Sequence, residues 1–421
     1  MLRAGAIDQA THDRHRSTYA AARSTRSKLS GARRVAMDAV LENLEDVAAG
    51  GLLTVSRLPA LFETVARNRQ WWANGPLLAN GRRVTFSGSR LVWQHYAGQG
   101  LQLQWLGTFG KANGLFQART RDTQLRELLD EALALAAQRA GGIAFEYLFR
   151  FGGGRPPWAS GLAQGTAVQA LSRAAVRLNE PRFFDGARAA LGIFRTAPPQ
   201  GVRVDTENGP HYLIYSYAPK LRVLNGFVQA LNGLHDFALL ANDAEGRALF
   251  SAGENRLRAE LGGYDTGGWS RYSNARDSDV GYHKLLRDFL RNLCGRLTDD
   301  AKRPDGGPKP GADPAPYCAI AQRFTQDLTR DPKIALRSRR VRAGRPASVK
   351  LTLDKPAFVT LTLRRGGRTV AVLRSRLDSG RTSLRWARPR RSGKHTVTLR
   401  ATDLAGNDAS ATGALDVLKA K

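Results

Sequence analysis

The chain has 421 residues and a formal net charge of +29, and 42% of its residues are hydrophobic. This length can bury full cores in two or three domains, and the composition excludes a disordered protein. No run reaches the roughly 18 apolar residues of a membrane-spanning helix, so we expect no integral membrane segment. The positive charge favours an acidic partner, but no nucleic-acid-binding motif is present and we expect no nucleic acid.

Residues 1–34 are basic and show no sustained hydrophobic period, which predicts a flexible arm. Residues 35–120 begin at helical spacing and continue with short alternating runs between Gly, Asn and Pro residues. We expect them to form the N-terminal, helical and β-rich part of a larger unit. This part contains four tryptophans: Trp71, Trp72, Trp93 and Trp105. They could line a sugar-binding cleft or fill the core, and the sequence does not decide between these roles.

Residues 121–330 alternate helical and loop segments roughly every 40 residues, which is the rhythm of an α/α barrel, or toroid. The loops at one end of such a barrel form its site. One segment, HYLIYSYAPKLRVLNGF at residues 211–227, places Tyr215 and Tyr217 before a proline and a helix-like run. Such a segment commonly brings reactive side chains to the mouth of a helical scaffold, although two half-buried loop tyrosines would also explain it.

The only two cysteines, Cys294 and Cys318, bracket a loop rich in Pro and Gly. This arrangement favours a disulfide over two separate thiols, and a disulfide indicates an oxidising compartment. No second Cys or His pair accompanies them, so we expect no metal. The glycine run at residues 152–154 lacks the Lys-Ser/Thr ending of a phosphate-binding loop, and we expect no cofactor.

From residue 331 to 421 alternating segments such as SVKLTL, FVTLTL and HTVTLRATD are separated by turns, which predicts a small antiparallel β-sandwich. Its 22 Lys and Arg against 6 Asp give a net charge of 22 − 6 = +16. The segment ATDLAGND resembles the closing strands of Ig-like modules appended to bacterial extracellular enzymes. The fold class is therefore mainly α, with an α/α toroid, a small β-rich N-terminal part and this sandwich.

The first 16 residues, MLRAGAIDQATHDRHR, contain no apolar segment of a signal peptide. The chain is therefore either cytoplasmic or lacks the start of its reading frame. The expected disulfide and the Ig-like module favour the second alternative, with an extracellular or cell-surface location. The oligomeric state is open, and a homodimer is one alternative.

Four segments between residues 157 and 283 resemble, in order, motifs of the C-terminal domain of D-glucuronyl C5-epimerases. They are PPWASGLAQGTAVQAL, YSYAPKLRVLNGFVQALNGLHDF, YDTGGWSRY and DSDVGYH. The corresponding family motifs are W-x-S-x-(M/L)-A-Q-G-x-A, EEYP-x-x-P-x-x-x-VLNGF, LYDTGSG-x-x-Y and DYH. Enzymes of this family convert D-glucuronate to L-iduronate within heparosan- or heparan-type chains. The resemblance thus implies an isomerase that acts on an acidic polysaccharide.

The resemblance also assigns residues. The proton carriers would be Tyr215, Tyr272 and Tyr282. Further motif residues are expected to bind the substrate: Trp158, Gln164, Tyr217, Lys220, Arg222, Asn225, Tyr264, Arg271, Arg276 and His283. The family has an acidic residue directly before its first tyrosine, whereas this chain has Ile214.

The chemistry explains why tyrosines suit this reaction. The C5 proton lies α to a carboxylate, so its removal places a second negative charge beside the first, and this charge must be stabilised. Inversion follows when one base removes the proton and a second group returns one from the opposite face. A phenol has a pKa of about 10, which nearby Lys or Arg lowers, while a second, neutral tyrosine donates. The basic residues of the motifs could lower the phenol pKa in this way or hold the uronate carboxylate bidentately. They are Lys220, Arg222, Arg271 and Arg276.

Two alternatives remain open. A polysaccharide lyase would share the first proton removal and then eliminate at C4, whereas a hydrolase would need two carboxylates that face one bond. The available carboxylates are Glu146, Asp205, Glu207 and Asp265, the last of which could instead hold its turn. A non-catalytic protein that binds acidic glycans is the alternative from a different class.

Overall fold

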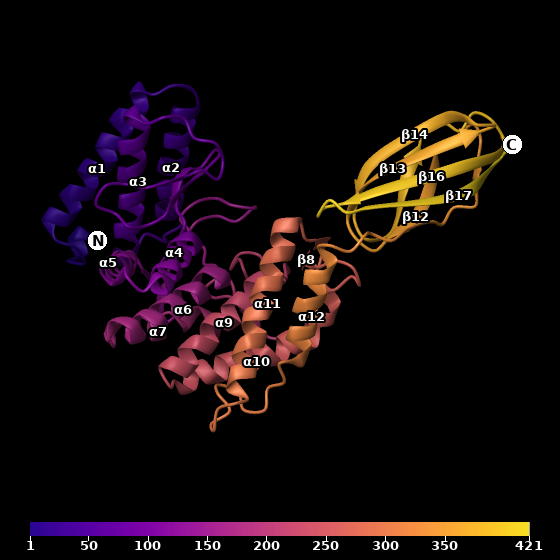
Figure 1. Ribbon diagram of the computed structural model, residues 1–421. Helices are drawn as coiled ribbons and strands as arrows, with labels where there is room; N and C mark the ends of the chain where they lie inside the picture. Colours follow the sequence, from indigo (N-terminus) through magenta and orange to yellow (C-terminus); the bar gives the residue numbers. More distant parts are fainter. Residues whose placement is uncertain (421) are drawn as a thin grey trace. The chain divides into compact units, whose positions relative to one another are not determined.

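The computed structural model describes residues 1–420, which divide into two compact units (Figure 1). The first unit comprises Met1–Arg222, Gln229–Leu257 and Gly306–Pro310. The second comprises Val223–Val228, Arg258–Asp305 and the chain from Gly311 onward. The chain therefore crosses between the units several times, and neither unit coincides with one of the predicted domains.

The first unit begins with three helices: α1 (Gln9–Lys28), α2 (Gly31–Ala49) and α3 (Leu58–Asn74). Residues 1–34, for which the sequence predicts a flexible arm, thus contain a full helix. Its contacts are made by single side chains without a period: the Tyr19 hydroxyl donates to Glu45 at 2.6 Å, and the His15 ring lies 4.2 Å from that of Phe62. Such isolated long-range contacts leave no hydrophobic pattern in the sequence.

A three-stranded antiparallel sheet follows, with β1 (Arg83–Val84), β2 (Trp93–Tyr96) and β3 (Gly100–Leu103) in that order. Helix α4 (Trp105–Ala118) begins directly after it, because the Gln104 side chain accepts a hydrogen bond from the Gly107 amide at 3.0 Å. Of the four tryptophans, Trp72, Trp93 and Trp105 are at most 1% exposed and belong to the core. Trp71 lines a cavity of about 790 Å³ together with Leu77 and Val92.

The remaining elements up to residue 260 are mostly helical. They are α5 (Asp122–Ala134), β4 (Ala137–Arg139), β5 (Gly142–Ala144), α6 (Gly161–Leu178), α7 (Arg182–Ala189), α8 (Gly192–Arg195), β6 (Arg203–Val204), β7 (His211–Tyr212), α9 (Leu224–Leu240) and α10 (Ala244–Glu260). Helices α6 and α9 touch backbone to backbone, because a Cβ at Gly233 would lie 1.9 Å from the Gly165 carbonyl oxygen. Helices α9 and α10 are divided between the two units, so the arrangement of the helices as an α/α toroid stays a prediction.

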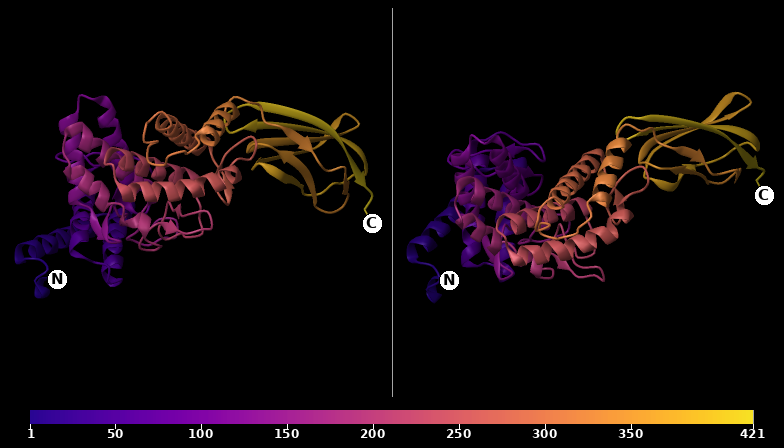
Figure 2. Two further views of the ribbon diagram at one scale, coloured as in Figure 1. Left: turned by 90° about the horizontal axis from the view of Figure 1, so that it is seen from below. Right: turned by 60° about the horizontal axis from the view of Figure 1, so that its bottom comes forward.

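The helical part of the second unit contains the short hairpin β8 (Arg271–Ser273) and β9 (Arg276–Asp277), then α11 (Val280–Asp300) and α12 (Ala315–Asp327). Helices α11 and α12 lie side by side (Figures 1 and 2). A disulfide between Cys294 and Cys318 joins them, which confirms the predicted pairing.

The β-domain, residues 331–420, completes the second unit with eight strands. They are β10 (Ile334–Leu336), β11 (Arg340–Arg342), β12 (Ala347–Leu353), β13 (Ala357–Arg365), β14 (Arg368–Leu377), β15 (Gly380–Trp386), β16 (Gly393–Asp403) and β17 (Asp408–Leu418). One sheet has the order β10-β12-β15 and the other β11-β17-β16-β13-β14, with only the β11–β17 pair parallel. Alternate residues of both sheets, such as Val349, Leu361 and Leu399, form one apolar core. Its classification as an Ig-like sandwich stays a prediction.

Candidate functional site

Two of the three predicted proton carriers form a pair in the second unit. Tyr272 lies on β8 and Tyr282 in the first turn of α11, and their ring centroids are 4.6 Å apart at an angle of 51°. The Asp279 side chain caps α11 by accepting a hydrogen bond from the Tyr282 amide at 2.8 Å. Tyr272 is 7% exposed, whereas Tyr282 is 38% exposed. We call Tyr272 and Tyr282 the tyrosine pair.

A cation lies against this pair. The guanidinium carbon of Arg276, on β9, is 4.5 Å from the Tyr272 ring centroid. Burial raises the pKa of the Tyr282 phenol, as do its neighbours Tyr272 and Asp279, and the Arg276 charge only partly opposes this rise. Tyr282 is therefore a neutral phenol at neutral pH, the form that can donate a proton.

His283 follows Tyr282 but is fully buried. Its Nδ1 lies 3.2 Å from the Ser270 amide nitrogen, which donates to it, and its Nε2 lies 2.9 Å from the Phe324 carbonyl oxygen. This pattern requires a neutral imidazole with its proton on Nε2. Burial is the main cause that lowers the pKa of His283 to about 4. Both ring nitrogens are thus engaged within the protein, and the expected role of His283 in substrate binding stays a prediction.

Asn225 of the VLNGF motif is connected to the same hairpin. Two residues before it, Val223 forms an isolated antiparallel bridge with Ser273 of β8. Asn225 is 3% exposed, and within residues 1–420 neither its side-chain nitrogen nor its oxygen has a hydrogen-bond partner. A buried amide without partners is costly unless a ligand or water satisfies it. The role of Asn225 in substrate binding stays a prediction.

The third predicted proton carrier, Tyr215, lies in the first unit within an aromatic cluster. Its ring stacks on that of Tyr217 at 5.3 Å and meets Trp158 edge to face at 5.6 Å. The Tyr217 ring covers Gly154 so closely that a Cβ there would lie 2.3 Å from it. The cluster also includes Tyr96, Tyr147, Phe149 and Phe151. Because the tyrosine pair belongs to the second unit, convergence of all three tyrosines on one sugar stays a prediction.

Trp158 and Gln164 hold the scaffold around this aromatic cluster. Trp158 is 3% exposed, and its Nε1 donates to the Phe149 carbonyl at 2.8 Å. The Gln164 side chain donates to the carbonyls of Ile143 and Ala190 and accepts from the Phe145 amide. Both side chains therefore have a structural function, whatever further contacts they make with a substrate.

The other predicted binding residues differ in exposure. Lys220 and Arg271 are exposed, Arg222 is partly exposed and donates to the Pro219 carbonyl, and Tyr264 is buried. Ile214, at the position of the acidic family residue, is 7% exposed and belongs to the core. The chain therefore has an apolar side chain where the family has a charge beside its first tyrosine.

Two of the carboxylates considered for hydrolysis are engaged in structural contacts. Glu146 is 4% exposed and pairs with Arg57 at 2.7 Å and with Arg139 at 2.7 Å. Asp265 accepts from the Gly267 amide at 2.8 Å, as expected for a residue that holds its turn, and pairs with Arg323 at 2.9 Å. Both carboxylates therefore already have partners within the protein.

The residues that position the tyrosine pair were not recognised from the sequence. Asp279 caps α11, and Trp269 stacks on the His283 ring at 3.8 Å and 9°. An Asp three residues before Tyr282 is a detectable capping signal, and Trp269 lies inside the YDTGGWSRY motif. No group of three or more potential metal ligands was found in residues 1–420, and no helix of this part is long and apolar enough to cross a membrane.

Comparison with known proteins defines the class of this tyrosine-bearing segment. Residues 140–301 match the family model described as D-glucuronyl C5-epimerase C-terminus, so this segment is a domain of the family that its motifs predict. The D-glucuronyl C5-epimerase of Caenorhabditis elegans is 33% identical over 130 residues, which are 28% of this chain and 21% of that protein. The chain thus matches about a fifth of the length of this curated relative.

Two solved structures that the chain matches show weak likeness to it. The endo-β-1,4-glucanase CMCax of Acetobacter xylinum is 16% identical, with a TM-score of 0.33. The match covers 54% of this chain and 72% of the glucanase chain. The twitchin kinase region of Caenorhabditis elegans is 11% identical, with a TM-score of 0.16. That match covers 62% of this chain and 57% of the twitchin chain. Neither similarity carries an argument about fold or activity.

Proposed function

We propose that this protein is a uronyl C5-epimerase that converts D-glucuronate to L-iduronate within a heparosan-like polysaccharide. The observation that carries the proposal is the tyrosine pair beside Arg276, within the segment that matches the epimerase family. A site for this reaction needs a proton donor and acceptor on opposite faces of the sugar and a cation for the developing charge.

The reaction begins when one tyrosine, as phenolate, removes the C5 hydrogen as a proton. The electron pair of the broken C–H bond moves into the carboxylate and gives a dianionic intermediate. Arg276 stabilises this charge, and a neutral phenol then returns a proton to the opposite face of C5. Because the pKa of Tyr282 is raised, we assign the donor role in this direction to Tyr282. The base is one of the other two family tyrosines, Tyr215 or Tyr272, and of these Tyr272 contacts both Tyr282 and Arg276. In the reverse direction the two tyrosines exchange roles.

The proposal also includes glycan binding by the outer face of the five-stranded sheet of the β-domain. On this face Thr360 of β13 pairs with Arg374 of the neighbouring strand β14. On its other side it pairs with Arg400 of β16, so the two arginines flank Thr360. Two strand spacings separate the arginines by about 9.5 Å. In the next row outward-facing Phe358, which is 59% exposed, lies opposite Arg376. Arginines beside an exposed aromatic ring suit a sugar chain that carries carboxylates.

The test is exchange with solvent deuterium at C5 when the chain is incubated with heparosan and other glucuronate-containing polysaccharides. Epimerisation predicts deuterium at C5 and the appearance of L-iduronate. A lyase on the same scaffold would instead give an unsaturated product that absorbs in the ultraviolet. Binding of the polysaccharide without exchange would identify a non-catalytic glycan-binding protein. An extracellular or cell-surface location, which the disulfide supports, is part of the proposal.

A further inference from the structure

Lys355, between β12 and β13, is a fully buried cation whose contacts join the β-domain to helix α12. Its Nζ lies 3.0 Å from the Asp403 carboxylate, 2.6 Å from the Asp327 carbonyl oxygen and in hydrogen-bond contact with the Arg330 carbonyl oxygen. An ammonium has three N–H donors, and these three acceptors use all of them. Because Asp327 is the last residue of α12 and Arg330 follows three residues later, Lys355 also caps this helix.

The acceptor of this cation is itself held in place. The Asp403 carboxylate accepts hydrogen bonds from the backbone amides of Ala405 and Asn407 and from the Asn407 side chain. The same side chain donates to the Leu328 carbonyl at 3.0 Å. Both ends of the Lys355–Asp403 pair are thus fixed to the end of α12, as charges buried in a protein require.

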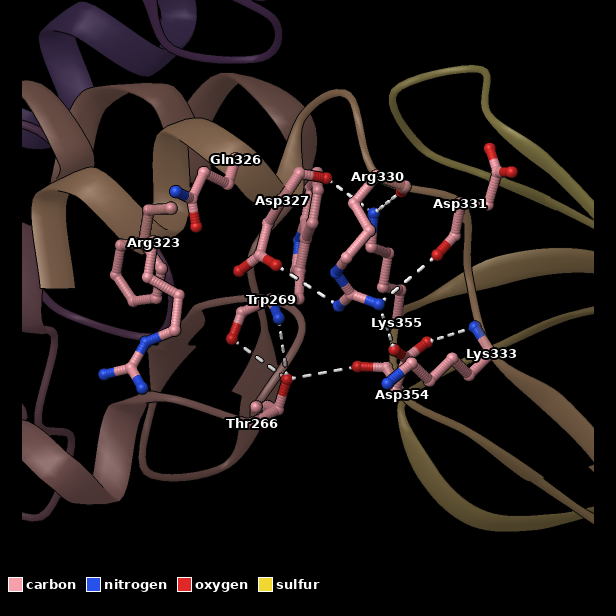
Figure 3. Close-up of polar contacts among 12 residues, drawn as sticks. Thr266, Trp269, Arg323, Gln326, Asp327, Arg330, Asp331, Lys333, Asp354 and Lys355 are labelled. Atoms are coloured by element: carbon pink, nitrogen blue, oxygen red, sulfur yellow. Dashed lines mark hydrogen bonds and ion pairs between the residues drawn. The ribbon is translucent and has the colours of Figure 1, made fainter.

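The Thr266 turn, residues 265–270, also contacts the β-domain, where Thr266 lies beside Asp354 (Figure 3). The ammonium lies 5.9 Å from the ring centroid of Trp269, and the Thr266 hydroxyl lies 3.3 Å from the Asp354 carbonyl oxygen. Arg330 pairs with the Asp354 carboxylate at 2.7 Å. A Cβ at Gly268 would come within 2.7 Å of the Asp354 carbonyl oxygen, so only glycine permits this approach.

Gly268 and Trp269 are also the two positions at which the turn departs from the family motif LYDTGSG-x-x-Y. Both departures lie in the contact with the β-domain: Gly268 makes room for Asp354, and Trp269 places its ring beside the Lys355 ammonium. The Trp269 ring then stacks on His283, and its Nε1 donates to the Ser278 carbonyl at 2.9 Å. Trp269 therefore connects Lys355 to Ser278 and His283, in the C-terminal half of the segment 270–283.

A second contact holds the hairpin from its other strand. Asp277, the last residue of β9, accepts hydrogen bonds from Ser379 in the β14–β15 turn, at 2.9 Å from the amide and 2.6 Å from the hydroxyl. The Tyr272 hairpin, residues 271–277, is thus fixed to the β-domain at both ends. A hairpin of two short strands is not stable alone in water, so these contacts determine its conformation.

We propose that the β-domain is a positioning element for the candidate active site, in which Lys355, Asp354 and Ser379 hold the Thr266 turn and the Tyr272 hairpin so that Tyr272 is presented to substrate. The β-domain is then an integral part of the catalytic unit and not only a carbohydrate-binding appendage. Only one part of this inference, the contact of Tyr272 with substrate, rests on the proposed function.

The test uses the full chain with Lys355→Met. This substitution removes the ammonium and its three hydrogen bonds but keeps a long, unbranched side chain that can stay buried. Lys350→Met on the exposed outer side of β12 is the matched control. In the Lys355→Met chain, hydrogen exchange at the amides of Thr266, Ser270 and Ser278 is expected to accelerate about tenfold. The amides of β13 and β16, in the sheet core, are expected to keep their protection.

In Lys355→Met the misplaced Tyr272 is expected to lower kcat for C5 exchange about tenfold. KM is expected to change less than about twofold, because substrate binding does not depend on Tyr272 alone. Ser379→Ala releases the other end of the hairpin without touching the buried cation and is expected to act in the same direction with a smaller effect.

Two outcomes overturn the inference. One is exchange of the Thr266, Ser270 and Ser278 amides at the wild-type rate in both Lys355→Met and Ser379→Ala; the other is faster exchange of these amides with unchanged kcat. If the wild-type chain shows no C5 exchange with any uronan, the proposed function fails. A hairpin that loosens in Lys355→Met but not in Lys350→Met would still establish that the β-domain positions it.

Discussion

The Tyr272 and Tyr282 rings lie 4.6 Å apart although one belongs to a strand and the other to a helix. Each is held by its own element: Tyr272 by a hairpin fixed to the β-domain, and Tyr282 by the N-terminal turn that Asp279 caps. Substitution of either phenol by phenylalanine removes only a hydroxyl from a fixed ring, which makes the pair suitable for functional tests.

Tyr282→Phe and Tyr215→Phe are each expected to reduce C5 exchange about a hundredfold or more, because general acid–base groups contribute at least this much. Their unfolding temperatures should stay close to that of the wild type. Tyr19→Phe, which removes a hydroxyl from helix α1, outside the epimerase-like segment 140–301, provides the control and should retain full exchange. Retention of more than half the activity in Tyr282→Phe would remove this residue from the mechanism.

His283 predicts a specific pH dependence of stability. Its pKa of about 4 in the folded chain lies below the ordinary value of 6.5, so the unfolded chain binds a proton more readily. The stabilisation is complete above about pH 6.5 and is lost as the pH falls towards 4, by about 3 kcal/mol in total. Lys355 and Arg287 oppose protonation and Asp403 favours it.

His283→Gln removes this titration while keeping an amide that can donate to the Phe324 carbonyl. Urea unfolding between pH 4 and pH 7 should show a shallower loss of stability in this variant than in the wild type. Equal slopes in the two chains would show that His283 is not held neutral by burial.

The fold and the site were predictable from the sequence to different extents. The VLNGF helix, the disulfide and the alternating segments of the β-domain follow from local spacing, and the structure has α9 and the Cys294–Cys318 bond where they were expected. Helix α1 and the Lys355 contacts were not predictable, because they depend on single side chains that meet partners far away in sequence. Lys355 in particular resembles any other lysine at a strand turn, and only the fold shows that it is buried.

Glu146→Gln is expected to lower the free energy of unfolding by about 3 kcal/mol, because it leaves two buried guanidinium groups without a counter-charge. Glu127→Gln, at an exposed pair with Arg90, should cost less than about 1 kcal/mol. Chemical denaturation of both variants measures the difference. A small effect at Glu146, with loss of activity in the folded protein, would instead indicate a catalytic role and favour the hydrolase alternative.

The outer face of the five-stranded sheet predicts a charge-specific loss of glycan affinity. Arg374→Gln combined with Arg400→Gln should weaken binding to immobilised heparosan about tenfold, since each exposed pair contributes up to about 1 kcal/mol. The control combines Lys350→Gln with Arg385→Gln on the other sheet, which removes the same charge. Equal weakening by the two double variants would show a response to net charge alone.

The most direct test of the central claim is the initial rate at which solvent deuterium enters C5 of heparosan glucuronate, measured by NMR for the wild type beside Tyr282→Phe. We predict that the wild type incorporates deuterium at C5 and accumulates L-iduronate, and that Tyr282→Phe does so at about a hundredth of this rate. A folded wild-type chain that binds heparosan yet leaves C5 unlabelled, there and on other uronans, would contradict the assignment of this protein as a uronyl C5-epimerase.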